Sequence, residues 1–236
     1  MKQPIYTRSP DLSRRRYLAG IATAGGVWTA GCLGGRFGND SSVVLDAPSD
    51  QPDSDNLPYP SYGEPFPTIE LPDPLAGERV STDDEPLVDR TLVVTAFYAF
   101  CPAECVLLIG SMAEAQQVIV NEGAADEVSF LAITFDPERD TAEALTTHAK
   151  DMNVDLDAGN WRYLRPEDDD EASVVVTEDL GIFFEADGGA GGGYEFIHNT
   201  LTYIVNPDRY IERAYRDDDL DVKRVSDEAL AVADAY

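Results

Sequence analysis

The stretch LVVTAFYAFCPAEC, residues 92–105, decides the fold. An almost unbroken apolar run such as 92–100 is typical of a strand whose two faces are both covered. Cys101 and Cys105 follow where the strand gives way to a helix, and a spacing of four residues puts both sulfurs on one face of its first turn. The helix dipole and the free backbone N–H groups there favour thiolates. Two such thiolates can close a disulfide, carry out redox chemistry or bind a soft metal ion, and this stretch alone leaves the three alternatives open.

Outward from this stretch, apolar runs and turn residues predict short strands separated by helices. We predict strands at 68–71, 78–81, 92–100, 128–135, 161–164, 201–205 and 210–215, the first two forming a hairpin. We predict helices from the cysteine pair to about 121, over 142–152, over 166–180 and over 222–235, with Thr141 or Asp140 capping the second. This alternation predicts an α/β fold with a central mixed β-sheet flanked by helices and an N-terminal β-hairpin.

The N-terminus has the pattern of an export signal. Arginines 14–16 precede a weakly apolar stretch, 19–30, which is too short to span a bilayer. Paired arginines in this place indicate the twin-arginine route, and Thr29-Ala30-Gly31-Cys32 resembles a lipoprotein processing site. We therefore expect residues 1–31 to be removed and Cys32 to carry lipid. The alternatives are an ordinary signal with an incidental cysteine, or an uncleaved anchoring helix.

Residues 32–66, the tether, are rich in Gly, Asp, Ser and Pro and show no apolar period. Such a composition predicts a disordered acidic spacer between the membrane and a folded domain at 67–236. A domain on such a spacer could search the membrane surface for its partner.

The balance of acidic and basic residues limits the kinds of molecule that this protein could bind. The chain has 45 acidic and 17 basic residues, a net charge of -28, which argues against nucleic acid as a partner. Acidity spread along the whole chain suits a protein that stays soluble in concentrated salt, where self-repulsion is screened. The alternative is a protein of ordinary salinity with acidic disordered ends.

Three motifs occur in a fixed order. The first is the apolar strand that runs into Cys101-x-x-x-Cys105, and the second is a strand ending in TFDPERDT, residues 134–141. The third is His198, just before a strand that runs into Asn-Pro-Asp at 206–208. With these motifs, residues 67–236 resemble the Sco/SenC family of copper-handling, thioredoxin-like proteins. Val106 departs from the family, which usually has proline after the second cysteine.

The resemblance implies a thioredoxin-like fold with an inserted hairpin and a copper ion, Cu(I) or Cu(II), held by Cys101, Cys105 and His198. It places Asp136 and Asp140 beside the site, although both could simply form a turn and a helix cap. It also implies delivery of copper, or of reducing equivalents, to the copper-bearing subunit of a cytochrome oxidase. We expect a monomeric lipoprotein of the kind found in halophilic archaea, anchored to the outer face of the cell membrane.

The chemistry of these residues agrees with copper. Thiolates select Cu(I), and imidazole binds both oxidation states. Structural zinc usually has four protein ligands, and the other histidine, His148, has polar neighbours that predict an exposed position. A permanent disulfide is the weaker interpretation, because so small a ring adds little loop entropy.

Two functions remain. The first is a copper metallochaperone, a binding and transfer protein rather than an enzyme. The second is a membrane-tethered thiol–disulfide oxidoreductase that reduces the cysteines of the oxidase copper site and needs Cys101 and Cys105 but not His198. Peroxide reduction is weaker still, because the sequence shows no Pro-x-x-x-Thr-x-x-Cys pattern.

Overall fold

The computed structural model describes residues 42–49, 57–188 and 194–236 of the chain. The predicted export signal, Cys32 and the remaining parts of the tether therefore lie outside the described residues, as does most of the glycine-rich run before His198. Among the residues that are described, no helix has both the length and the apolar character needed to cross a membrane.

A five-stranded mixed sheet forms the centre, with the order β5-β4-β3-β8-β9. Its members are β3 (Thr91–Phe97), β4 (Val128–Thr134), β5 (Trp161–Leu164), β8 (Thr202–Val205) and β9 (Ile211–Tyr215). β3 runs parallel to β4, β4 parallel to β5, and β8 antiparallel to both β3 and β9. Every residue of β3 and β4 is buried, as their continuous apolar runs predict.

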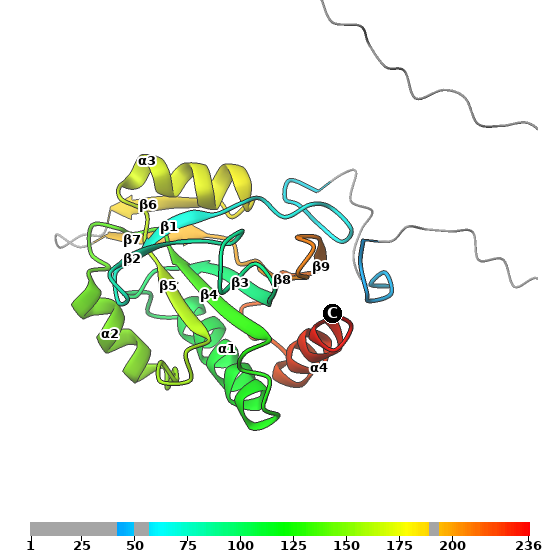
Figure 1. Ribbon diagram of the computed structural model, residues 1–236. Coiled ribbons are helices and arrows are strands. Elements are labelled where there is room, and N and C mark those ends of the chain that lie inside the picture. The colour runs from blue at the N-terminus through cyan, green and yellow to red at the C-terminus, as the bar shows by residue number, and fades with distance from the viewer. Residues whose placement is uncertain (1–41, 50–56, 189–193) are drawn as a thin grey trace, which may run out of the picture. The chain divides into compact units, whose positions relative to one another are not determined.

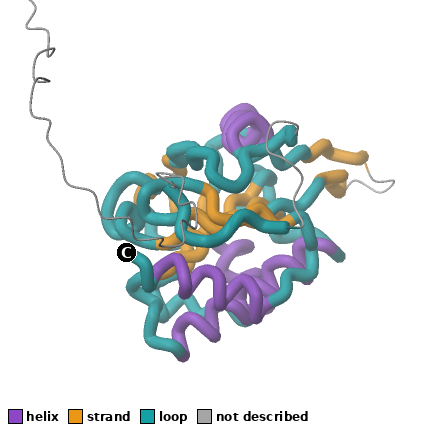
Figure 2. The backbone as a smooth tube through the Cα atoms, turned by 90° about the vertical axis from the view of Figure 1, so that its right-hand side faces the viewer, coloured by secondary structure: helices purple, strands orange, loops and turns teal. Residues whose placement is uncertain are grey.

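Helices lie on both sides of this sheet (Figures 1 and 2). α1 (Glu104–Asn121) and α4 (Val222–Ala233) pack against each other on one side. α3 (Asp169–Ala172) lies on the other and continues as a π-helix, Ser173–Asp179, where the sequence predicts one acidic helix. α2 (Ala142–Asp151) begins as predicted. Its inner residues face the core, and its first turn is capped by the Thr141 hydroxyl, which accepts a hydrogen bond from Ala144 N at 3.3 Å.

Two hairpins stand outside the central sheet. β1 (Glu70–Asp73) and β2 (Glu78–Ser81) form the predicted N-terminal hairpin. β6 (Phe184–Gly188) and β7 (Tyr194–His198) form a second one, which is absent from the strands predicted above. Its apolar residues alternate with acidic ones on both sides of the glycine-rich run, and this period of two was the signal for a hairpin.

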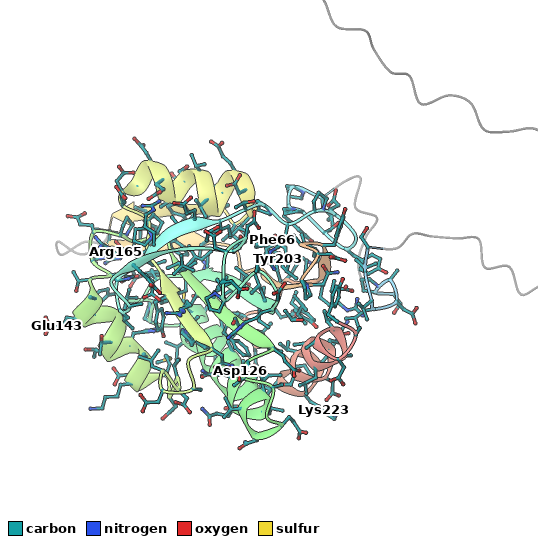
Figure 3. The ribbon with its side chains drawn as sticks, viewed as in Figure 1. Phe66, Asp126, Glu143, Arg165, Tyr203 and Lys223 are labelled. Carbon is teal, nitrogen blue, oxygen red and sulfur yellow. The ribbon has the colours of Figure 1, made fainter. Side chains whose placement is uncertain are left out.

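Part of the predicted tether is packed against the domain. Glu212, fully buried in β9, accepts hydrogen bonds from Val44 N at 2.7 Å and Leu45 N at 2.9 Å. Phe66 is 5% exposed and its ring meets that of Tyr203 edge-on at 5.9 Å (Figure 3). The prediction of disorder is therefore wrong for residues 42–49 and 57–66, because composition did not reveal the buried carboxylate and the apolar surface that hold them.

Candidate metal centre

The three predicted motifs meet at one edge of the sheet. Phe97 at the end of β3 pairs with Thr134 at the end of β4, so the cysteine turn and residues 135–141 leave the same edge. β8 is antiparallel and starts at this edge, where Thr202 pairs with Thr95. The connection into β8 therefore brings His198 there too. Motifs about 30 and 60 residues apart in the sequence thus become neighbours at this edge.

The two cysteines and His198 form a cluster, the only group of three such residues in the described ranges whose ligand atoms could share a metal ion. Their ligand atoms all lie within 4.8 Å of one another. Cys105 Sγ lies 3.7 Å from His198 Nε2, and both cysteines are free and buried. The three residues singled out from the sequence are thus brought together as the resemblance implies.

The start of α1 stabilises a thiolate at Cys101. The Sγ atom of Cys101 accepts a hydrogen bond from the backbone N–H of Cys105 at 3.3 Å, in the first turn of the helix. A hydrogen bond from the Cys105 side chain, with a further one from His198, lowers the pKa of Cys101 to about 3 against the opposing effect of burial. The pKa of Cys105 is raised because it shares its proton with Cys101 and is buried. The pair therefore carries one readily available thiolate.

His198 presents one ring nitrogen to the sulfurs. Its Nδ1 lies 3.3 Å from the carbonyl oxygen of Asn199, which can only accept, so Nδ1 is the donor and Nε2 is left to face Cys105. Burial by itself would lower the pKa of His198, but hydrogen bonds to Cys101 and to that carbonyl raise it. The ring is held edge-on against Tyr98 at 5.9 Å and tilted against Phe135 at 5.3 Å. An imidazole oriented in this way is prepared to act as a ligand.

Asp140 stabilises the loop that leads from β3 to Cys101. Its carboxyl accepts hydrogen bonds from Ala99 N at 3.0 Å and from the Thr134 hydroxyl, and it is fully buried. Burial raises its pKa to about 6. The helix cap is Thr141, so of the two roles considered for Asp140 the structure favours holding the loop two residues before Cys101.

Asp136 acts on the histidine side of the site. It pairs with Arg139 and accepts a hydrogen bond from the Tyr194 hydroxyl at 2.9 Å. Tyr194 opens the strand that carries His198. Arg139 and Tyr194 were missed from the sequence, although Arg139 lies within the quoted TFDPERDT motif, where a positive charge between two aspartates was a usable signal.

His148 is not the exposed histidine that its polar neighbours predict. It is 7% exposed, and its Nδ1 lies 3.1 Å from the Tyr163 hydroxyl. Burial lowers its pKa to about 4. The polar residues around it lie on the outer face of α2, whereas His148 falls on the inner face with Leu145 and Ala149.

Val106 preserves the helix start without the family's proline. Its backbone N–H donates to the carbonyl of Ala103 at 3.1 Å, a bond that proline could not make, and α1 begins at Glu104. The side chain is 40% exposed, and Phe100 on the other side of the cysteine pair is 55% exposed. The turn is therefore intact, with an apolar rim beside the cysteines.

Comparisons with known proteins agree with this fold. Among solved structures, Arabidopsis thaliana ScoI with copper bound is 20% identical over 73% of this chain and 98% of that chain, with a TM-score of 0.57. A SCO1/SenC family lipoprotein from Bacillus anthracis is 18% identical over 75% and 96%, with a TM-score of 0.59. BsSco, described as a member of the Sco family of cytochrome c oxidase assembly proteins, is 16% identical over 75% and 97%, with a TM-score of 0.55. These likenesses confirm the thioredoxin-like fold of the Sco proteins.

The family assignment comes from the sequence match. No curated protein matches this chain. The family model described as SCO1/SenC matches residues 75–232, well over half of the chain, and that range includes both cysteines and His198. The chain belongs to the SCO1/SenC family.

Proposed function

We propose that this protein is a copper metallochaperone that binds one copper ion through Cys101, Cys105 and His198. The observation that carries the proposal is the convergence of these three ligand atoms within 4.8 Å of one another. Two sulfurs and one imidazole nitrogen match the preferences of copper, above all of Cu(I). Copper is the cargo of such a protein, and its destination is the copper-bearing subunit of a membrane cytochrome oxidase.

The protonation of the cluster suits uptake and release. Metal binding requires thiolates and a neutral imidazole. Cys101 already has a lowered pKa, so loading displaces mainly the proton of Cys105 and any proton on His198. Oxidation of the two cysteines to a disulfide removes both sulfur ligands, so loading also depends on the redox state of the pair. A three-ligand site leaves room for a ligand from the acceptor to enter before the donor's ligands leave.

Relatives support the same assignment. The Arabidopsis thaliana protein is described with copper bound, and BsSco as a member of a family of cytochrome c oxidase assembly proteins. The Bacillus anthracis relative is described as a lipoprotein. We extend these descriptions to this chain because it shares their family and carries the cysteine and histidine cluster.

We further propose that the protein works outside the cell on the membrane surface, as a monomer that does not bind nucleic acid. Residues 1–31 would direct export by the twin-arginine route, and lipid on Cys32 would anchor the mature chain. The net charge of -28 suits a medium of concentrated salt. The mass of the mature N-terminus, compared with that of a Cys32→Ser variant, tests the anchor; an unmodified Cys32 would exclude it.

Copper binding by the purified, reduced protein tests the ligand set. We expect one copper per chain, and a loss of affinity of roughly 100-fold or more in His198→Ala, since even groups that only orient a ligand contribute 10–100-fold. His148→Gln is the matched control, because it replaces the other histidine of the chain and leaves the three ligands in place. Equal affinity in the parent and His198→Ala would refute the proposal.

A second function has support from one specific observation, the lowered pKa of Cys101. A stabilised thiolate can attack a disulfide of a partner, and Cys105 can then resolve the mixed disulfide, so the partner is reduced by two electrons and this pair is oxidised. Such a thiol–disulfide oxidoreductase would not need His198. The test uses cells whose own gene for this protein has been deleted. If His198→Ala restores oxidase activity in these cells, thiol–disulfide exchange is favoured over copper delivery.

A further inference from the structure

The strand that carries His198 is not hydrogen-bonded into the central sheet. Within the described part of the chain, β6 and β7 pair only with each other. Hairpin β6–β7 thus has none of the backbone ladders that hold the cysteine loop, which follows directly from β3. The position of His198 relative to the sulfurs therefore depends on the short connection into β8 and on side-chain contacts between this hairpin and the domain.

Arg139 makes several of these contacts. Its Nη1 donates to the carbonyl oxygen of Tyr194 at 2.7 Å, and its guanidinium lies 3.8 Å from the centre of the Tyr194 ring. Its Nε forms an ion pair with Asp136, whose side chain is 2% exposed, and the Tyr194 hydroxyl closes the triangle on the same carboxylate at 2.9 Å. A planar guanidinium can stack and donate at once, which lysine cannot do.

The same guanidinium also reaches the cysteine side. It lies 5.5 Å from the ring centre of Phe100, the residue before Cys101, and 5.8 Å from that of Phe196, two residues before His198. It lies 5.7 Å from the ring of Tyr98, which packs edge-on against His198. Arg139 therefore contacts both ligand-bearing segments while sitting on a third, residues 135–141.

We propose that Arg139 is a positioning residue that clamps hairpin β6–β7 onto the domain and so keeps His198 within reach of the two cysteines. It does not bind the ion itself. The inference rests on the proposed copper site. In it, Arg139, Asp136 and Tyr194 together determine whether His198, the third ligand, lies close enough to the sulfurs to bind the ion. Loosening this clamp would convert a three-ligand site into a two-sulfur site.

A double-mutant cycle tests the proposal with the full-length protein. Copper affinity is measured by chelator competition for the reduced parent, Arg139→Met, His198→Ala and the double variant, and thermal unfolding reports on the fold of each. We expect Arg139→Met to weaken copper binding about tenfold or more, within the range typical of groups that orient a ligand. In the His198→Ala background the same change should alter the affinity less than about twofold, because the two changes act through one group.

The absorption of the Cu(II) form gives a second readout. If Arg139 acts through His198, the sulfur-to-copper band of Arg139→Met shifts towards that of His198→Ala, whereas a general loss of stability would leave the band of the remaining folded protein unchanged. Tyr194→Phe is the milder variant. It keeps the ring under the guanidinium and removes only the hydrogen bond from the hydroxyl to Asp136. We therefore expect copper affinity to fall about threefold, and to stay unchanged when the same substitution is made in His198→Ala.

Arg165→Met is the matched control. Arg165 donates to the carbonyl of Pro137 at 3.0 Å, on the same segment 135–141, so its loss perturbs that segment without removing the Arg139 contacts. Copper affinity should stay within about twofold of the parent. Equal losses with and without His198, or no loss in Arg139→Met, would overturn the clamp while leaving the copper site standing. If the parent binds no copper, or if His198→Ala binds copper as tightly as the parent, both proposals are overturned. This result is obtained before Arg139 is changed.

Discussion

Replacing Asp140 by Asn should change how the stability of the protein depends on pH. The Asp140 carboxyl is fully buried, its Oδ2 accepts hydrogen bonds from Ala99 N and the Thr134 hydroxyl, and within the described structure its Oδ1 has no partner. Burial raises its pKa from 3.8 to about 6. The folded protein therefore holds a proton that the unfolded chain has already lost between these two values.

The sign and size of the effect follow from this difference. Because the folded state binds more protons, the contribution of Asp140 to the free energy of unfolding is fully present below pH 3.8 and is lost as the pH rises through 6. A shift of about two pH units corresponds to about 3 kcal/mol. Asn has the same shape and cannot ionise, so relative to the parent the variant should gain about 3 kcal/mol between pH 4 and pH 7.

His148 opposes Asp140 in the same range. Burial lowers its pKa from 6.5 to about 4, so here the unfolded chain binds more protons, and stability rises with pH by about 3 kcal/mol between 4 and 6.5. The parent should thus show a shallow profile, whereas Asp140→Asn should show the unopposed rise due to His148. His148→Gln, conversely, should show a fall in stability over this range.

Urea unfolding at pH 4, 5, 6 and 7, at constant salt concentration, measures these profiles. Asp126→Asn provides the control, because the Asp126 side chain is fully exposed and its replacement should change stability by less than about 0.5 kcal/mol at any pH. A difference between Asp140→Asn and the parent that stays constant from pH 4 to pH 7 would refute a buried, proton-holding Asp140.

Two further predictions concern the packed part of the tether. Gly181 has φ +67°, and a Cβ there would lie 2.7 Å from Tyr59 Cα and 2.8 Å from Pro58 O. Gly181→Ala should therefore destabilise the protein by about 2 kcal/mol or more in urea unfolding. An unchanged unfolding midpoint would mean that residues 58 and 59 are not held against Gly181. Glu212→Gln should weaken the attachment of residues 42–45, since hydrogen bonds to a buried charge contribute about 1.5–3 kcal/mol, and limited proteolysis should then cut this segment faster than in the parent.

Sequence patterns by themselves determined the frame of the domain. The continuous apolar runs at 92–100 and 128–135 predict buried strands, and the strands that form there, β3 and β4, are buried at every residue. The first run was predicted too long, because its strand ends at Phe97 and Phe100 is exposed. Along α1, the apolar residues Leu108, Met112, Ala115 and Ile119 recur at the spacing of one helix face, and all four are buried. The three proposed metal ligands were also within reach of the sequence, through the motifs that it shares with the family and because cysteine and histidine are rare in this chain.

Only the tertiary structure decided which side chains surround those ligands. The polar neighbours of His148 in sequence predict an exposed residue, but they lie on another face of α2, and His148 is buried against Tyr163 of β5. The carboxylate that holds residues 42–45 is 167 positions away from Leu45, and Arg139 meets Tyr194 across 55 positions. The partners in such contacts depend on strand order and helix packing, which are set by the whole domain, so the local sequence does not name them.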